Sequence, residues 1–593
     1  MKNYSINSST YTMGQHLYTV HNIKATKSQE KVGGSETTNI AKFLQGAKTE
    51  KLDLNKDLVK WFCVDLLPFS TVKKDGFQYF FKRHMKQLTL PDESTLRKTT
   101  LIEVYEEIKT KLVADLHDVH TINLMFDGWT DAHHKCPYLG LRISYLNKEW
   151  EYRIATVSCK ILPVHTGESV AQHVRSELDQ ILPKGRKEMS IFSTHDGAAN
   201  MKKCSEKLKV KDYQHCAAHS LHLLIMNDGI NKIPAMKFVL ENCKSVVRTL
   251  QFKGSLLEEN CSAIQDLSMV EEVINKVHKE LDLDESFPVG ESDEPAEAAE
   301  VCTYSTLKTS VITRWNSNLT MIESILKILP AVNNSLKMTG NYDLCLTDED
   351  KEILIELKAF LQTFKELTDI VSANEPHLGL IPLMKSAIVK ACRTKDGETG
   401  LIRDLKTAVL RNVEKRFKIS NSVRMACLCD PSLKDTLGMS KREQLEFLQA
   451  AAAELVLQSD EKTSETEGHG SDAVMEPDSD HTSKRRKLIA EMQDSSINGA
   501  AEDCSEEITS YLTVKPTKEE QDDPLLFWKL NMGRYPIMGI LAKCYLSLSA
   551  SSVPVEAMFS TVGLVANGKR SALAPFKLNA ISFIHDNTKL LGL

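Results

Sequence analysis

Two aspartates follow runs of strand-forming residues, and this spacing could place two carboxylates at one edge of a sheet. One predicted strand ends at Asp127 in "TINLMFDGWT", and another ends at Asp196 in "MSIFSTHD". In open α/β sheets, functional groups collect at the carboxyl ends of the strands. Asp-Gly is also a common turn pair, so a surface turn is the alternative at both positions.

Carboxylates at neighbouring strand ends cannot both stay charged unless a cation lies between them. Oxygen-only ligands suit Mg²⁺ or Mn²⁺, which keep open positions for water and phosphate. A pair of such ions can activate the attacking oxygen of a phosphodiester reaction and stabilise the leaving oxygen. A third carboxylate normally completes such a site, and we expect it elsewhere in the chain.

The elements that must hold these residues are predicted from apolar spacing. Residues 121–130, 138–146 and 151–164 are strand-like, and a helix is predicted at 166–182 with Thr166 or Ser169 as its N-cap. A fourth strand at 189–196 precedes helices at 198–208 and 213–230. The order β-β-β-α-β-α indicates an α/β core. Helical periodicity dominates residues 53–120 before it and 231–459 after it.

Bulk composition narrows the class of protein. The chain has 593 residues, of which 42% are hydrophobic and 26% charged, so we expect several globular domains. It has no apolar run of membrane-spanning length, and its first residues are polar, so we expect neither a membrane protein nor a signal peptide. Fourteen scattered cysteines favour reduced thiols in the cytosol or nucleus. The net charge of −6 argues against a chain that coats nucleic acid over its whole surface.

Five separated motifs occur in one order. They are "FDGWT" at 126–130, "HDGAANM" at 195–201, "CAAH" at 216–219, "TRWNS" at 313–317, and a long block from Asp523 to Pro575 that contains "SSVPVEAMFS". Together they resemble the hAT transposase superfamily, including its domesticated zinc-finger BED-type relatives. The resemblance covers roughly residues 50–593.

The resemblance implies an α/β fold in which an RNase H-like core with a mixed sheet is interrupted by a large α-helical insertion. A C-terminal hAT dimerisation region would complete that core. We predict a disordered lead-in at 1–45, a small helical domain at 46–120, the first part of the core at 121–230, the helical insertion at 231–458, a disordered acidic linker with a basic cluster at 459–508, and the dimerisation region at 509–593.

The resemblance also supplies the third acid, Glu556, on a helix after the insertion. Ser552 can cap that helix, and Pro554 is tolerated in its first turn. The implied catalytic and metal-binding residues are therefore Asp127, Asp196 and Glu556, with Mg²⁺ or Mn²⁺. The alternative for Glu556 is a carboxylate that merely complements the helix dipole.

Cys216 and His219 match a Cys-x-x-His motif of the family, and the resemblance implies that they support the second acid. Zinc binding is the alternative, but no second Cys or His pair lies nearby at finger spacing. We also expect no structural zinc finger near the N-terminus, because Cys63 is the one cysteine among the first 130 residues.

Arg314 and Trp315 match the family's insertion-domain motif, which implies DNA binding, with the tryptophan stacked on a flipped base or hairpin end. For Trp315 the alternative is a place in the hydrophobic core, where most helical aromatics lie.

The C-terminal block holds more apolar side chains than two helices can bury alone, so we predict that some of them contact a second subunit. The predicted dimerisation residues are Phe527, Trp528, Tyr535, Ile540, Leu541, Tyr545 and Phe559. The expected partners are DNA, a second copy of the chain and other nuclear proteins, with no membrane. The basic cluster "SKRRKL" at 483–488 suggests nuclear import and a nuclear location.

Two functional hypotheses follow. In the first, the chain is a hAT-type transposase whose three acids bind divalent metal and cut and join DNA strands. In the second, it is a domesticated, catalytically inactive regulator that dimerises and associates with nuclear proteins or DNA. A nuclease of RNase H type that is not a transposase is a third alternative, but it does not explain the C-terminal block.

Overall fold

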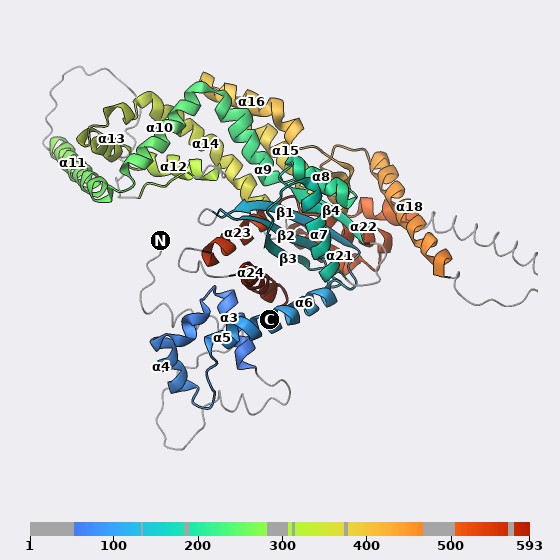
Figure 1. The fold of residues 1–593 in the computed structure, drawn as a ribbon. Helices are drawn as coiled ribbons and strands as arrows, with labels where there is room; N and C mark the ends of the chain where they lie inside the picture. The colour runs from blue at the N-terminus through green and yellow to red at the C-terminus, as the bar shows by residue number, and fades with distance from the viewer. Residues whose placement is uncertain are drawn as a thin grey trace, which may run out of the picture.

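The structure is a computed structural model of the 593-residue chain. It describes residues 53–131, 135–182, 189–280, 306–310, 315–372, 377–466, 504–566 and 574–592. A central sheet lies between N-terminal helices below it and a long helical insertion that extends to the upper left of Figure 1. This mixed α/β architecture, dominated by helices, agrees with the α/β class expected from the sequence.

The sheet has five strands in the order β3-β2-β1-β4-β5. The strands are β1 (Thr121–Thr130), β2 (Pro137–Leu146), β3 (Tyr152–Ile161), β4 (Ser190–His195) and β5 (Tyr213–His215). The first three form an antiparallel meander, whereas β4 runs parallel to β1 and β5 runs parallel to β4. The sheet is therefore mixed, as expected.

Two details of the predicted strands were wrong. Strand β1 does not end at Asp127 but continues to Thr130, because residues 127–130 pair with β2 in a hairpin. Residues 213–215 form the short strand β5, where a helix was expected, because their backbone pairs with β4 before the helix begins.

Four helical segments connect these strands to the rest of the chain. They are α7 (Gly167–Ile181), α8 (Ala199–Leu208), α9 (Ala217–His222) and the π-helical turn η3 (Leu223–Gly229), which leads into η4 (Ile230–Lys232). Thr166 is the N-cap of α7, since its side chain accepts a hydrogen bond from the backbone N–H of Ser169.

The N-terminal helices pack against the end of the chain. They are α3 (Leu54–Val64), η1 (Phe69–Lys73), α4 (Asp75–His84), α5 (Glu93–Thr95), η2 (Leu96–Thr100) and α6 (Leu101–Asp115). Both α3 and α6 contact the last helix, α24 (Pro575–Leu590), and all three share one hydrophobic core with the sheet.

The insertion is helical over its described length and has its own core. Its elements are α10 (Pro234–Leu250), α11 (Gly254–Glu280), α12 (Asn316–Leu326), α13 (Leu329–Met338), η5 (Tyr342–Leu344), α14 (Asp348–Val371), α15 (Leu380–Ala391), α16 (Gly400–Arg416), α17 (Asn421–Cys429) and α18 (Lys441–Thr466). Most of the linker predicted at 459–508 lies outside the described residues. Its described ends are helical, at 459–466 and 504–508.

The chain returns to the sheet through four more helices, α20 (Lys518–Asp522), α21 (Pro524–Asn531), α22 (Pro536–Leu546) and α23 (Val553–Val565), followed by α24. Helix α23 contacts β1 and β2, and α24 contacts β3. The last quarter of the sequence thus covers strands formed by its first third (Figure 1).

Most of the predicted dimerisation residues are buried within the chain itself, so this prediction needs correction. Phe527, Trp528, Tyr535, Leu541 and Phe559 lie in two hydrophobic cores of the chain, and Tyr545 packs against one of these cores. Their apolar area is covered by the chain's own helices, which sequence composition alone could not reveal. Ile540, in contrast, is 52% exposed.

Gly140 explains how closely α23 approaches the sheet. A Cβ atom at this position would lie 2.5 Å from Met558 Cε, 2.7 Å from Phe559 Cζ and 2.8 Å from Val555 Cγ1. These distances are shorter than any ordinary contact, so the helix can rest on β2 only where the strand has no side chain.

None of the described helices is both long and apolar enough to cross a membrane.

We predict that Gly140→Ala destabilises the protein, because the added methyl group must push α23 away from the sheet. The free energy of unfolding should fall by about 1–3 kcal/mol, the usual cost of overpacking a core. Chemical denaturation of the parent and the variant measures this difference. Gly128→Ala in β1 is the matched control, since its Cβ would make ordinary contacts of 3.8–3.9 Å. An equal loss of stability in both variants would contradict the close approach of α23.

Candidate carboxylate site at the sheet edge

Asp127 and Asp196 lie side by side at the carboxyl edge of the sheet. In the parallel pairing of β1 with β4, Met125 is opposite Thr194, and continuing this register by two residues brings Asp196 alongside Asp127. The rings of Phe126 and His195 confirm that the strands remain close there, with centroids 5.4 Å apart.

The side chain of Asp127 lies on the face of the sheet that α23 covers. Asp127 is directly opposite Gly140 in the antiparallel pair of β1 and β2, and directly opposed residues point to the same face. Because Gly140 faces Val555 and its neighbours on α23, Asp127 faces the helix that carries Glu556.

Each aspartate holds a hydrogen bond from the chain just after it. Oδ1 of Asp127 accepts from the backbone N–H of Gly128 at 2.7 Å, and Oδ1 of Asp196 accepts from that of Ala198 at 2.9 Å. Gly197 has a φ of +83°, a left-handed conformation that glycine adopts without strain. The chain can therefore turn sharply between the second acid and α8.

The charges of Asp196 and Glu556 both act on Asp127. Burial, the negative charge of Asp196 and, more weakly, that of Glu556 together raise the pKa of Asp127 to about 7, although the Gly128 hydrogen bond opposes this rise. Carboxylates that share a site in this way hold a proton or require a cation. The fold thus brings together the three acids that were separated in the sequence.

Glu556 is in the first turn of α23, and a buried arginine helps to fix that turn. Nη1 of Arg142 donates to the backbone oxygen of Pro554 at 2.9 Å, while Nη2 lies 3.6 Å from the carboxylate of Asp586 on α24. Ser552 is the N-cap of the helix by position, as predicted, but its side chain makes no capping hydrogen bond.

The segment that leads into α23, Ser547–Ser552, is completely buried. Every one of its six carbonyl groups accepts a hydrogen bond. The donors, in chain order, are Ser144 Oγ at 2.8 Å, Leu378 N at 2.9 Å, Thr194 Oγ1 at 2.8 Å, Ala217 N at 2.9 Å, Ser549 Oγ at 2.8 Å and Val555 N at 2.9 Å. Strands β2 and β4, helix α9 and the insertion therefore all hold this segment in place.

Cys216 lies just after β5, near Asp196, and contacts the start of α23, the helix that carries Glu556. It is buried, and its Sγ accepts a hydrogen bond from the backbone N–H of Ser552 at 3.3 Å and lies 3.6 Å from Ser551 Oγ. The ring of His219 lies 6.3 Å from that of His222. Cys216 therefore contacts the start of α23, and through this contact it could support the site, as the resemblance implies.

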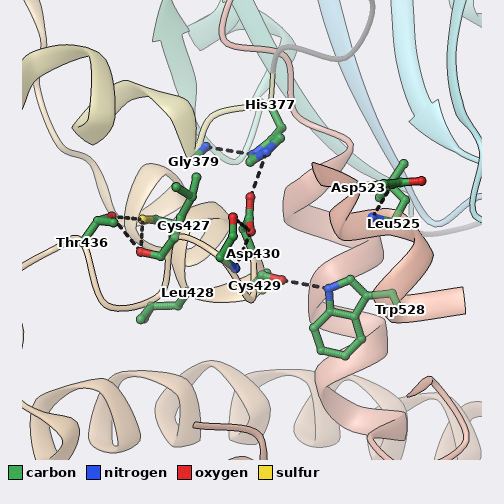
Figure 2. A network of polar contacts seen from close by, with 12 residues as sticks. His377, Gly379, Cys427, Leu428, Cys429, Asp430, Thr436, Asp523, Leu525 and Trp528 are labelled. Carbon is green, nitrogen blue, oxygen red and sulfur yellow. Dashed lines mark hydrogen bonds and ion pairs between the residues drawn. The ribbon is translucent and has the colours of Figure 1, made fainter. Parts of the chain in front are cut away.

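A buried pair, His377 and Asp430, also helps to hold the Ser547–Ser552 segment, and Figure 2 shows the contact between the two side chains. Nε2 of His377 lies 3.2 Å from Oδ2 of Asp430, and His377 also forms a β-bridge with Ser549. The turn after α17 holds the C-terminal helices as well, since the indole N–H of Trp528 donates to the backbone oxygen of Cys429 at 2.8 Å. The pair thus links the insertion to the C-terminal block.

The two residues proposed to bind DNA in the insertion, Arg314 and Trp315, are not placed at the carboxylate site by the structure. Trp315 is only 3% exposed and belongs to the core of the insertion, where it precedes α12. Its ring is covered in this conformation, so the structure corrects the predicted stacking role in favour of the core alternative. Arg314 lies outside the described residues.

The donor chemistry of the three acids fits a hard divalent cation, because all the available ligands are carboxylate oxygens. As the side chains lie, however, no three His, Cys, Asp or Glu groups among the described residues are arranged to hold a metal ion. The local hydrogen bonds of Asp127 and Asp196 offer a physical reason, since each turns one carboxylate oxygen toward its own backbone.

Several residues that shape the site were missed by the sequence analysis. They are Gly140, Arg142, Cys216's partner segment Ser547–Ser552, and the His377–Asp430 pair. Gly140 was recognisable in principle, because an isolated glycine within a strand often marks a close approach of another element. The ion pair had no local signal, since its partners are separated by more than fifty residues.

The C-terminal part of the chain matches a known family. Residues 507–588 match the hAT family C-terminal dimerisation region. This agrees with the resemblance derived from the sequence motifs.

Proteins of three kinds are similar to the chain over most of its length. A putative AC transposase of Zea mays is 25% identical over 85% of this chain and 61% of its own. A putative transcriptional regulator, tpeD, of Talaromyces stipitatus is 21% identical over 90% and 61%. The zinc finger BED domain-containing protein 4 of Homo sapiens is 19% identical over 85% and 41%. The chain therefore spans about three fifths or less of the length of these relatives.

We predict that Asp127→Asn stabilises the metal-free protein, increasingly so as the pH rises. A carboxyl group whose pKa is about 7 in the folded state binds more protons there than in the unfolded chain, so its ionisation destabilises the fold between about pH 4 and 7. Asparagine keeps the acceptor for Gly128 and removes this cost. The variant's gain in thermal midpoint should be absent near pH 4 and reach its maximum above pH 7.

Asp430→Asn should behave in the opposite way. Although burial acts against it, the hydrogen bond and charge of His377 lower the pKa of Asp430 below its ordinary value. Its ionised form therefore stabilises the fold at neutral pH, and this contribution disappears as the pH falls through the folded-state pKa. The loss of thermal midpoint in the variant should shrink on acidification. Parallel pH profiles for the two variants would contradict the assigned environments.

Proposed function

We propose that the chain, a hAT superfamily transposase-like protein, is a nuclear protein that dimerises, associates with DNA and cleaves and transfers DNA strands at Asp127, Asp196 and Glu556. The observation that carries the catalytic part is the electrostatic coupling of the three acids. Burial and the charges of the other two acids act on Asp127, although Glu556 is 360 positions beyond Asp196 in the sequence (556 − 196).

The sheet supports an RNase H-like core as the framework for this activity. Two of the acids lie at the carboxyl edge of a mixed sheet, and the third comes from a helix that packs on the same face after a long helical insertion. This is the arrangement that the family resemblance implies.

Each acid would contribute differently to the reaction. Burial and its acidic neighbours raise the pKa of Asp127 to about 7, so its carboxyl group can hold a proton near neutral pH and lose it when positive charge enters the site. Asp196 is oriented by the Ala198 N–H, and Glu556 is oriented by the anchored first turn of α23. Mg²⁺ or Mn²⁺, when bound, would activate the attacking oxygen and stabilise the leaving oxygen.

Two observations favour the alternative of a catalytically inactive regulator. The carboxylates do not form a preassembled metal cage among the described residues, and one similar protein is named as a putative transcriptional regulator. In this alternative the same fold serves dimerisation and association with nuclear proteins. The nuclear location is common to both functions, and the basic cluster proposed as its signal, 483–488, lies outside the described residues.

We predict that purified protein cleaves duplex DNA carrying hAT-type transposon ends in the presence of Mg²⁺ or Mn²⁺. Asp196→Asn should reduce the cleavage rate by at least about a hundredfold, the order of loss when one charge-stabilising group is removed from an active site. Gel analysis of labelled strands measures the rate. Asp179→Asn, at an exposed position of α7, is the matched control and should cleave as the parent does. Equal rates for Asp196→Asn and the parent, or no cleavage by either, would favour the inactive regulator.

Self-association is supported by the match to a dimerisation region, and exposed apolar side chains indicate a surface for it. Leu530 is 68% exposed, Met532 38% and Ile540 52%, all at the corner between α21 and α22. Met532 Cγ lies 3.3 Å from the position of a Cβ on Gly539, next to Ile540, and Leu530 precedes Met532 by two residues. We call these three residues the corner patch. We propose that this corner patch packs against a second copy of the chain.

We predict that the parent has about twice its 66.6 kDa chain mass in light scattering. The double variant Leu530→Asp, Ile540→Asp should be monomeric, because charged groups in an apolar interface would lose hydration without gaining partners. Phe252→Asp, at a residue that is 90% exposed in the insertion, is the control and should remain dimeric. A dimeric double variant would place the interface elsewhere.

A further inference from the structure

Three segments converge on the chain around Asp196, which directly follows the last residue of β4. Helix α8 begins three residues after Asp196, at Ala199, and β5 runs beside β4 with His215 opposite His195. The third segment, the chain that leads from α16 into α17, is tied to the start of β5, because Oγ of Ser422 in the first turn of α17 donates to Oδ2 of Asp212, the residue before β5, at 2.7 Å.

His215 lies at the centre of this convergence, pressed against the chain just after Asp196. A Cβ atom on Gly197 would lie 2.9 Å from Nδ1 of the imidazole ring, so the ring is in close contact with the glycine backbone. The ring also packs nearly parallel to that of Tyr213, with centroids 5.9 Å apart. The position of His215 relative to Asp196 is therefore fixed.

The charges of two lysines, one on α8 and one just before α17, act on the same ring. Burial lowers the pKa of His215, and the positive charges of Lys202 on α8 and Lys418 before α17 lower it further, whereas Asp196 acts in the opposite direction. Both ammonium groups thus act on a half-buried imidazole next to the second acid, and neither has an acidic partner within the described ranges.

Cationic side chains close to these lysines in the sequence do form ion pairs. Lys203, the next residue on α8, pairs with Glu168 at 2.7 Å, and Arg416, two residues before Lys418, pairs with Asp228 at 2.6 Å. Among the described residues, Lys202 and Lys418 lack such ion pairs, and an anion bound between them would be stabilised by both charges.

We propose that Lys202, Lys418 and His215 form a phosphate-contact surface that holds the DNA backbone beside Asp196. The lysines act as point charges toward phosphate oxygens, and an imidazole N–H can donate a hydrogen bond to the same group. They are positioning residues, which place a phosphodiester next to the candidate cleavage site without acting on the reacting atoms. This role rests on the DNA association included in the proposed function but does not require that the protein cleave DNA.

Salt-dependent binding tests the surface directly. Affinity of the full-length protein for a duplex of arbitrary sequence is measured by fluorescence anisotropy without divalent metal, between about 50 and 300 mM salt. Each lost phosphate contact reduces the slope of log affinity against log salt by about one. Lys202→Gln and Lys418→Gln should each show this reduction and bind roughly five- to tenfold more weakly at ~0.1 M salt.

Lys203→Gln is the matched control, since it removes the same charge from the adjacent position on α8, and its slope should equal that of the parent. Parent-like slopes for both Lys202→Gln and Lys418→Gln would overturn the surface and leave the proposed cleavage intact. Reduced slopes would support it even if the parent cleaves no DNA. A parent that binds no duplex would overturn both the surface and the proposed DNA association.

Discussion

A buried strip of backbone has to satisfy its hydrogen bonds, and four of the six carbonyl groups of Ser547–Ser552 do so through partners in other parts of the chain, namely β2, β4, α9 and the insertion. An unpaired carbonyl there would cost on the order of 1–3 kcal/mol. The requirement fixes where the segment lies, and α23 begins directly after it. The place of Glu556 relative to the sheet therefore depends on the backbone hydrogen bonds of the segment that precedes its helix.

The same constraint explains why the insertion is not an independent appendage. Helix α9 leaves the core beside the buried segment, and the His377–Asp430 pair returns to it from the far side of the insertion. Asp430 in turn lies next to Cys429, whose carbonyl accepts the hydrogen bond of Trp528 (Figure 2). The sheet, the insertion and the C-terminal helices are thus joined by polar contacts of the Ser547–Ser552 segment, the His377–Asp430 pair and the Trp528–Cys429 hydrogen bond.

Local patterns predicted the parts of this arrangement that depend on neighbouring residues. Strands β1 to β4, the Thr166 cap and the helix that carries Glu556 follow from alternation, capping and proline placement. Strand β5 was missed, because three residues paired on one edge leave too short a pattern. The burial of Trp528 and the open corner at Leu530 were equally hidden, since both depend on which distant helix covers a given face. The coupling of the three acids came from the family motifs and not from spacing.

The hydrogen bond between Ser552 and Cys216 joins residues 336 positions apart, and that between Arg142 and Pro554 joins residues 412 apart. Contacts of such separation close last, because a long loop of chain must be ordered before they form. On the ribosome, the sheet and the insertion are made well before α23 exists. Any shortened product that ends before residue 547 would carry two acids without the third and an uncovered apolar face at Gly140. The carboxylate site can therefore be complete only after residue 556 has been synthesised.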